Sequence, residues 1–265
     1  MLKWSKASSL LTAFIFASQL AGCVSQTTYV NSEKPFYNTQ HSPEEAASNR
    51  ISLGLKYLEK GNSARAKLNI DKAIELAPDM AQAHYTLAYY YQVVKEYEKA
   101  DQTYQKVIRM APNNADALNN YGVFLCQQGQ IEKAQQMLQA ALEVESYVRV
   151  AQTYENLGIC LFDHDREQFA EKTIQYLQRA LAHDARRLKS IEVLQQIFAE
   201  QKNWAQALYY SQRALDIKGI DADSLWNAYK LAILADQQKQ AQEYARVLLT
   251  RFASSAQAEK LRQTL

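Results

Sequence analysis

Small and apolar residues recur along this chain with a period of about 34 residues. Ala66, Ala100 and Ala134 lie one period apart, and so do Pro78 and Pro112. A period of this length is typical of a unit built from two helices, the second of which ends at the proline. Because one helix pair cannot bury its apolar face alone, neighbouring pairs stack into a continuous core and leave a long curved surface. The pattern therefore predicts an all-α scaffold whose work is binding.

The spacing predicts six such units, whose boundaries follow the recurring small residues. The first residues of the units are Ala47, Ala81, Ala115, Ala151, Leu188 and Ala222. Extra residues between Phe162 and Thr173 lengthen the fourth unit, and we expect them to form a loop. Gly54, Ala88 and Gly122 are expected where the two helices of a unit meet, because only a small side chain permits close approach there.

The order of residues within a unit resembles the tetratricopeptide repeat. In the first unit the matching residues are Leu53, Gly54, Tyr57, Ala66, Ile70, Ala73 and Pro78. The second and third units repeat most of this order, whereas the fifth and sixth lack the Leu-Gly pair, as terminal repeats commonly do. The resemblance implies a right-handed superhelical solenoid of about six tetratricopeptide repeats over residues 47–265.

The start of the chain carries a second pattern. Lys3 and Lys6 precede an apolar stretch over residues 10–20. This order is typical of a secretory signal, and the stretch is shorter than the ~20 apolar residues that a membrane-spanning helix needs. Residues 1–22 are therefore predicted to be a signal peptide, and the mature protein is predicted to be exported.

The signal ends in Leu20-Ala21-Gly22-Cys23, which resembles the lipobox of bacterial lipoproteins. The resemblance implies that Cys23 is acylated, so that covalent lipid anchors the mature N-terminus, and we expect no other cofactor. Val24 follows the cysteine, and the absence of aspartate there implies sorting to the periplasmic face of the outer membrane. The alternative is an ordinary signal peptide in which Cys23 is incidental.

Residues 23–46 contain many Ser, Thr, Asn and Gln residues and two prolines, Pro35 and Pro43. They show no helical periodicity. We therefore expect a lipidated N-terminus and a flexible linker that holds the repeats clear of the lipid surface.

The charges of the chain argue against nucleic acid as a partner. The chain has 30 basic and 28 acidic residues, and two of the basic ones, Lys3 and Lys6, belong to the predicted signal peptide. The predicted mature chain thus carries equal numbers of both signs. Nucleic-acid binding needs clustered Lys and Arg side chains, and Arg186, Arg187 and Lys189 form only a short patch. We interpret that patch as a solvated helix end.

Motifs for catalysis are missing from the sequence. It has no phosphate-binding glycine loop, no HExxH zinc motif and no GxSxG nucleophile elbow. Asp163, His164 and Asp165 are adjacent residues that cannot easily converge on one metal ion, so we interpret them as a solvated turn. His84 occupies a position where the repeat pattern has a packing residue. We expect neither an enzyme nor a metal site, and no small-molecule substrate.

Two further cysteines, Cys126 and Cys160, lie in the first helices of neighbouring units. Counted from the first residue of each unit, they occupy positions 12 and 10, where the side chains can approach closely enough for a disulfide. An exported protein enters an oxidising compartment. The sequence leaves two alternatives open: a Cys126–Cys160 disulfide, or two buried thiols that pack as small apolar side chains.

Positions 2, 5, 9, 12 and 13 of each first helix line the concave side of a tetratricopeptide array. In units one to four these positions hold Ile51, Leu55, Leu58, Tyr85, Tyr89, Val93, Asn119, Val123, Cys126, Glu155, Ile159 and Phe162, and in the last two units they hold Lys189, Glu192, Glu200 and Lys230. Exposed apolar patches usually mark partner sites, so we predict a groove that binds a polypeptide. Asn119 is expected to hold the backbone of that polypeptide. The alternative is that these side chains pack against the next helix.

Residues 119–126, Asn-Asn-Tyr-Gly-Val-Phe-Leu-Cys, resemble a stretch in the third repeat of the PilF/PilW family of type IV pilus biogenesis lipoproteins, and residues 155–158 also fit that family. Members are pilotins, which escort the secretin subunit to the outer membrane and promote its assembly into a ring. The resemblance implies this function, with the type IV pilus secretin as partner. The repeat spacing is equally compatible with an outer-membrane lipoprotein adaptor that serves envelope protein assembly or peptidoglycan enzymes.

Overall fold

The computed structural model describes residues 42–264, and the regular structure in that range is entirely α-helical. The predicted signal peptide, Cys23 and the linker up to residue 41 lie outside the described residues. The helices of the described range are α1 (Pro43–Glu59), α2 (Ser63–Leu76), α3 (Ala81–Val93), α4 (Tyr97–Met110), α5 (Ala115–Gln127), α6 (Ile131–Leu142), α7 (Val150–His164), α8 (Arg166–His183), α9 (Leu188–Glu200), α10 (Trp204–Lys218), α11 (Ala222–Leu234), α12 (Gln238–Arg251) and α13 (Ala256–Arg262). Within this range, no helix has the length and apolar character that crossing a membrane requires.

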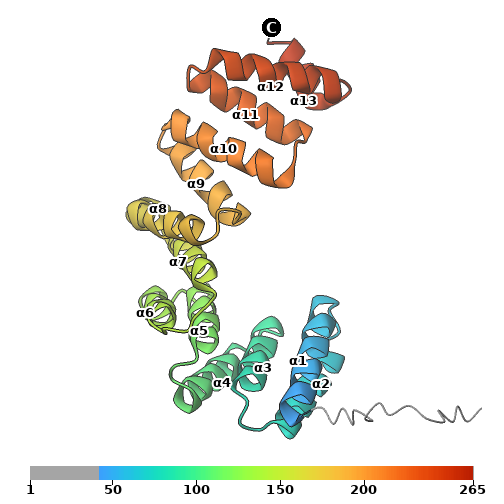
Figure 1. Ribbon diagram of the computed structural model, residues 1–265, viewed down its shortest axis with the longest axis vertical. Coiled ribbons are helices and arrows are strands. Elements are labelled where there is room, and N and C mark those ends of the chain that lie inside the picture. The colour runs from blue at the N-terminus through green and yellow to red at the C-terminus, as the bar shows by residue number, and fades with distance from the viewer. Residues whose placement is uncertain (1–41, 265) are drawn as a thin grey trace, which may run out of the picture. The chain divides into compact units, whose positions relative to one another are not determined.

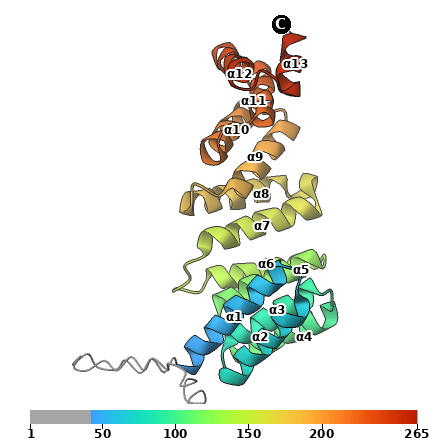
Figure 2. The ribbon, with the colours of Figure 1, turned by 90° about the vertical axis from the view of Figure 1, so that its right-hand side faces the viewer.

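The first twelve helices form six hairpins that stack in the order of the sequence (Figure 1). The two helices of each hairpin pack against each other, and the second helix of each of the first five hairpins also contacts the first helix of the next. Figure 2 shows the same order of α7 to α12 from another side. Helices α3, α5, α9 and α11 begin at the predicted unit starts, and α7 begins one residue earlier. The prediction of an all-α tetratricopeptide solenoid is confirmed.

Helix α1 begins before the predicted unit start at Ala47 because its N-terminus is well capped. The Ser42 hydroxyl accepts a hydrogen bond from the backbone N–H of Glu45 at 3.1 Å, and the Glu45 carboxylate accepts one from the backbone N–H of Ser42 at 3.3 Å. Pro43, which has no N–H to leave unpaired, occupies the first turn. Residues 43–46, which are predicted to belong to the linker, are therefore helical instead.

Small residues lie where the two helices of a hairpin cross, as predicted. A Cβ atom at Gly122 would lie 2.6 Å from Cγ of Leu138 on α6, and one at Gly158 would lie 2.5 Å from Cδ2 of Leu177 on α8. Ala88, at the equivalent position of α3, is fully buried. The close approach of α5 to α6 and of α7 to α8 therefore depends on the absence of a side chain.

The extra residues of the fourth unit lengthen its helices instead of forming a loop. Helix α7 has 15 residues, α8 has 18, and only Asp165 separates them. Asp165 has an extended backbone and accepts a hydrogen bond from the backbone N–H of Gln168 at 2.9 Å, so it ends one helix and caps the next. The predicted solvated turn is wrong for Asp163 and His164, which form the last turn of α7.

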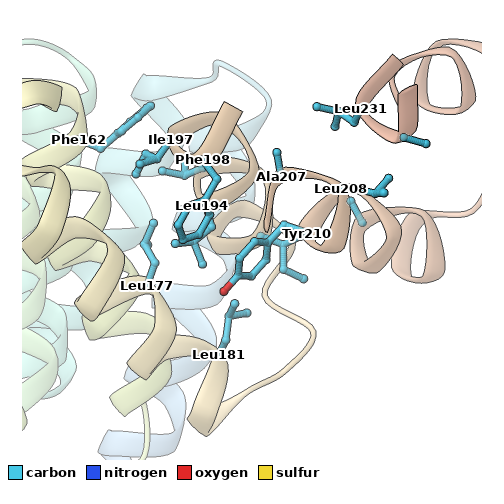
Figure 3. Packing of buried hydrophobic residues seen from close by; sticks show 14 of the residues in the cluster. Phe162, Leu177, Leu181, Leu194, Ile197, Phe198, Ala207, Leu208, Tyr210 and Leu231 are labelled. Atoms are coloured by element: carbon cyan, nitrogen blue, oxygen red, sulfur yellow. The ribbon is translucent and has the colours of Figure 1, made fainter. Parts of the chain in front are cut away.

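An apolar core joins consecutive hairpins. Figure 3 shows the part in which Leu177 and Leu181 of α8 lie near Leu194 and Phe198 of α9. The ring of Tyr210, on α10, stacks on that of Phe198 with 5.6 Å between the ring centroids. Each hairpin is thus stabilised in part by its neighbours, which is the expected behaviour of a repeat array.

Helix α13 covers the C-terminal end of the array. Its side chains Ala258 and Leu261 are buried in one cluster with Leu248 of α12. The Ser255 hydroxyl caps the helix by accepting a hydrogen bond from the backbone N–H of Ala258 at 3.1 Å. The division of the sequence into six helix pairs did not include this helix, which shields the apolar face of the last pair.

Candidate protein-binding surface

The first helices of successive hairpins form a row. Helix α1 contacts α3, α3 contacts α5, α5 contacts α7, and α7 contacts α9. Side chains at equivalent positions of these five helices therefore lie next to one another. We call the surface formed by α1, α3, α5, α7 and α9 the first-helix face.

An open apolar pocket lies on the first-helix face between α1 and α3. Its volume is about 200 Å³, and it is lined by Leu55, Leu58 and Glu59 of α1 and by Tyr89 and Val93 of α3. Tyr89 is 42% exposed and Val93 is 43% exposed. Four of the five lining residues were predicted to line the groove. The pocket is open to solvent and can accept one apolar side chain of a partner.

Three further predicted residues, Tyr85, Val123 and Ile159, extend this face toward the later hairpins. Each is partly exposed. Burial raises the pKa of Tyr85 to about 12, and the negative charge of Asp116 also raises it. The Tyr85 phenol therefore keeps its proton to a higher pH than an exposed tyrosine does.

Four predicted groove residues are buried: Ile51 is 1% exposed, Asn119 4%, Glu155 7% and Phe162 5%. The prediction that they line an open groove is wrong, and the alternative of packing within the array holds for them. Ile51 lies in the core cluster of the first hairpins. The guanidinium carbon of Arg166 lies 4.3 Å from the centroid of the Phe162 ring and covers it.

The side chain of Asn119 bonds to the next hairpin. Its Oδ1 accepts hydrogen bonds from Oγ1 of Thr153 and from Nδ2 of Asn156, both at 2.9 Å. The hydroxyl of Tyr147 lies 2.7 Å from Oγ1 of Thr153 and completes the group. The Asn119 oxygen is therefore used inside the array, where it joins α5 to α7.

Glu155 makes a corresponding contact one hairpin later. Nη2 of Arg187 donates to its Oε1 at 2.5 Å, and the backbone N–H and Oγ of Ser190 donate to its Oε2 at 3.1 and 2.7 Å. Burial raises the pKa of Glu155, but the hydrogen bonds from Arg187 and Ser190 and the charge of Arg187 outweigh burial, so the pKa lies below its ordinary value. The sequence holds a signal for both contacts: a polar residue at position 5 of one unit precedes a hydroxyl residue at position 3 of the next.

Cys126 and Cys160 are joined by a disulfide. Their sulfur atoms lie 2.15 Å apart and their Cα atoms 5.8 Å apart. Cys126 belongs to α5 and Cys160 to α7, so the bond links the third and fourth hairpins covalently. Of the two alternatives that the sequence left open, the structure contains the disulfide.

The remaining candidate site residues are either buried within the array or exposed on its surface. His84 is buried, and its Nε2 lies 2.6 Å from the carbonyl oxygen of Pro78. Lys189, Glu200 and Lys230 are exposed. Within residues 42–264, no group of three His, Cys, Asp or Glu side chains is arranged to hold a metal ion.

Comparison with known proteins assigns these repeats to a family. Residues 47–80 match the family described as tetratricopeptide repeat, and residues 81–146 match YpiA-like, C-terminal tetratricopeptide repeats. An uncharacterized protein of Haemophilus influenzae is 30% identical over 185 residues, which cover 70% of this chain and 98% of that protein. The type IV pilus assembly protein PilF of Pseudomonas aeruginosa is 29% identical over 231 residues, 87% of this chain and 88% of PilF. The chain belongs to the PilF-like family of tetratricopeptide-repeat proteins.

The fold of this PilF-like protein agrees with the sequence relationship. A solved structure of Pseudomonas aeruginosa PilF is 27% identical, covers 84% of this chain and 99% of its own, and superimposes with a TM-score of 0.64. In the PilF-like chain described here, the apolar pocket lies between the first two hairpins, whereas the third and fourth hairpins use Asn119 and Glu155 to contact their neighbours. The pocket is therefore an open, apolar part of the first-helix face.

Proposed function

We propose that this PilF-like protein is an outer-membrane lipoprotein pilotin that binds the type IV pilus secretin and promotes its localisation and multimerisation. The relationship to PilF, a type IV pilus assembly protein, supports a role in pilus assembly. The open apolar pocket between α1 and α3 is the observation that carries the binding role. A surface of this kind supports recognition of another polypeptide and requires no catalytic group.

The pocket between α1 and α3 has the size of a docking site for one anchoring side chain of the secretin. Burial of a leucine or phenylalanine side chain contributes about 1.5–3 kcal/mol. The partly exposed Tyr85 lies on the same helix as Tyr89, and Asp116 and Arg149 act on its phenol. Apolar anchoring together with a few polar contacts is the usual composition of a binding site for a peptide.

Lipid on Cys23 is the second part of the proposal, and Cys23 lies outside the described residues. Several acyl chains on one residue would hold the protein at the periplasmic face of the outer membrane almost permanently. Confinement of bound secretin subunits to one surface raises their effective concentration, which favours assembly into a multimer without any bond chemistry.

Variants of the pocket test the recognition step. Tyr89→Ala and Val93→Ala remove exposed walls of the pocket, so each is expected to weaken secretin binding about tenfold while the fold survives. Tyr209→Ala is the matched control, because Tyr209 is 48% exposed and belongs to α10. Affinity for purified secretin is measured for all three variants. Equal affinities of the wild type and both pocket variants would overturn the proposed site.

Replacement of Cys23 tests the anchoring step separately. Cys23→Ala is expected to leave secretin binding unchanged and to shift secretin multimers out of the outer-membrane fraction, because the binding surface stays intact without the lipid. Correctly localised multimers in the Cys23→Ala strain would contradict the role of the anchor. Absence of the secretin from material captured with the wild type would reject the pilotin function itself.

A further inference from the structure

The last two hairpins differ from the others in the way their first helices meet. Consecutive first helices are in contact from α1 to α9, but between α9 and α11, both described over their whole length, no pair of Cα atoms lies within 8 Å. A cleft of about 360 Å³ lies there, bordered also by α10. Its polar lining includes Glu192 and Gln195 of α9, Lys218 of α10, and Asp223, Ser224 and Asn227 of α11.

At the preceding junction, polar side chains connect the first helices α7 and α9. There the carboxylate of Glu155 receives hydrogen bonds from the Arg187 guanidinium at 2.5 Å and from Ser190 at 2.7 and 3.1 Å. Arg187 stands directly before α9, and Ser190 is the third residue of α9. A buried carboxylate is therefore satisfied by a cation and a serine that the next repeat supplies.

At the junction between α9 and α11 no arginine stands before the next first helix. Glu192 and Ser224 occupy the positions that Glu155 and Ser190 occupy one junction earlier, but the residue directly before α11 is Asp221. Asp221 accepts hydrogen bonds from the backbone N–H and Oγ of Ser224 at 2.9 and 2.6 Å. The serine is thus bound to the cap of its own helix, and Glu192 receives neither of the two partners that Glu155 has.

The charges around the cleft are unbalanced. Nζ of Lys218 lies 3.6 Å from the carboxylate of Glu192, and its charge also acts on Asp221. Asp223 adds a third carboxylate, whose Oδ1 accepts a hydrogen bond from Nε2 of Gln257. The lining of the cleft therefore holds two carboxylates, of Glu192 and Asp223, and one ammonium group, of Lys218. The cleft has the volume of about a dozen water molecules, at about 30 Å³ each, which is enough for a side chain and part of a backbone.

We propose that the cleft between α9 and α11 binds an arginine side chain in an extended segment of a partner polypeptide. The guanidinium takes the role that Arg187 has at the preceding junction and pairs with the carboxylate of Glu192, with Asp223 as a further acceptor. Arginine fits better than lysine because its planar fork binds a carboxylate through two parallel hydrogen bonds. The side-chain amides of Gln195 and Asn227 both donate and accept, which suits the backbone of the segment.

Titration of the full chain with short blocked peptides tests this site. The probe is acetyl-Ser-Arg-Ser-amide, and its control is the same peptide with citrulline, which keeps the shape of arginine without its charge. The arginine peptide is expected to bind with a dissociation constant on the order of 1 mM, detectable by chemical-shift changes, and the citrulline peptide about tenfold more weakly. Binding of both peptides with equal affinity, or of neither, would overturn the proposal.

Variants locate the binding. Glu192→Gln is expected to lower the affinity for the arginine peptide about tenfold, because it removes the carboxylate but keeps the size of the side chain. Asp216→Asn is the matched control: Asp216 is an exposed residue of α10 outside the lining, so the net charge changes equally and binding should not change. An equal loss in both variants would show attraction by net charge only and would reject the site.

A third variant supplies the arginine from the chain itself. Asp221→Arg places arginine where the preceding repeat has it, and it is expected to abolish binding of the arginine peptide by occupying the cleft. Unchanged binding by Asp221→Arg would contradict the assignment. The proposal does not rest on the secretin as partner, because peptide binding in this cleft and secretin binding at Tyr89 are measured separately and with different variants.

Discussion

Reduction of the Cys126–Cys160 disulfide is expected to lower the thermal stability of the repeats. The two cysteines are 34 residues apart in the sequence. The chain-entropy relation for a loop of this length gives about 3.8 kcal/mol of stabilisation at 25 °C, through restriction of the unfolded chain. For a domain of this size, a loss of 1 kcal/mol lowers Tm by about 2–4 °C, so complete reduction is expected to lower Tm by about 8–15 °C.

Thermal unfolding of the full chain, followed by circular dichroism with and without a phosphine reductant, measures this effect. A Cys126→Ala, Cys160→Ala double variant is the control: its Tm should match that of the reduced protein and should not respond to the reductant. Hydrogen exchange should increase mainly in the third and fourth hairpins, which the bond joins. A change in Tm below about 2 °C, with two free thiols counted, would refute the reasoning.

Three further predictions concern the contacts between helices. Gly158→Ala should lower the free energy of unfolding by about 1–3 kcal/mol through overpacking against Leu177, measured by urea denaturation; an unchanged midpoint would contradict the close crossing. Asn119→Ala should cost about 1–3 kcal/mol because it removes the acceptor that Thr153 and Asn156 share, yet secretin binding should persist, and a selective loss of binding would return Asn119 to the partner site. Because the pKa of Glu155 is lowered in the folded chain, its stabilising effect is present above the unfolded pKa of about 4.3 and is lost as the pH falls through the folded pKa. The stability difference between the wild type and Glu155→Gln should therefore shrink below about pH 5, and a constant difference would contradict the assignment.

The repeat period predicted the boundaries of most hairpins because the steric demand at each helix crossing is local. Gly122 and Gly158 must be small wherever the two helices of a pair approach this closely, so their spacing is visible in the sequence. The first helix begins earlier than the period predicts, because its start is set by the Ser42 hydroxyl, which caps the backbone N–H of Glu45. The period could not predict helix α13 either, because this helix belongs to no repeat and packs on the end of the last pair.

The binding surface was only partly predictable because equivalent positions have different neighbours. Position 5 is Asn119 in the third repeat and Glu155 in the fourth, and both are buried because the next repeat supplies hydroxyl donors or a cation. Position 9 of the second repeat, Tyr89, meets no such partner and stays exposed. The position of a residue within its repeat therefore decides which helix face it lies on, and the residues of the next repeat decide whether a partner can reach it.

Site-specific photocrosslinking in cells tests the central claim most directly. A benzoylphenylalanine residue in place of Tyr89, at the wall of the apolar pocket, should form a covalent adduct with the secretin on irradiation, whereas the same residue in place of the exposed Tyr209 on α10 should not. Adducts at position 89 that contain no secretin, or secretin adducts of equal yield at both positions, would contradict recognition of the secretin by the pocket between α1 and α3.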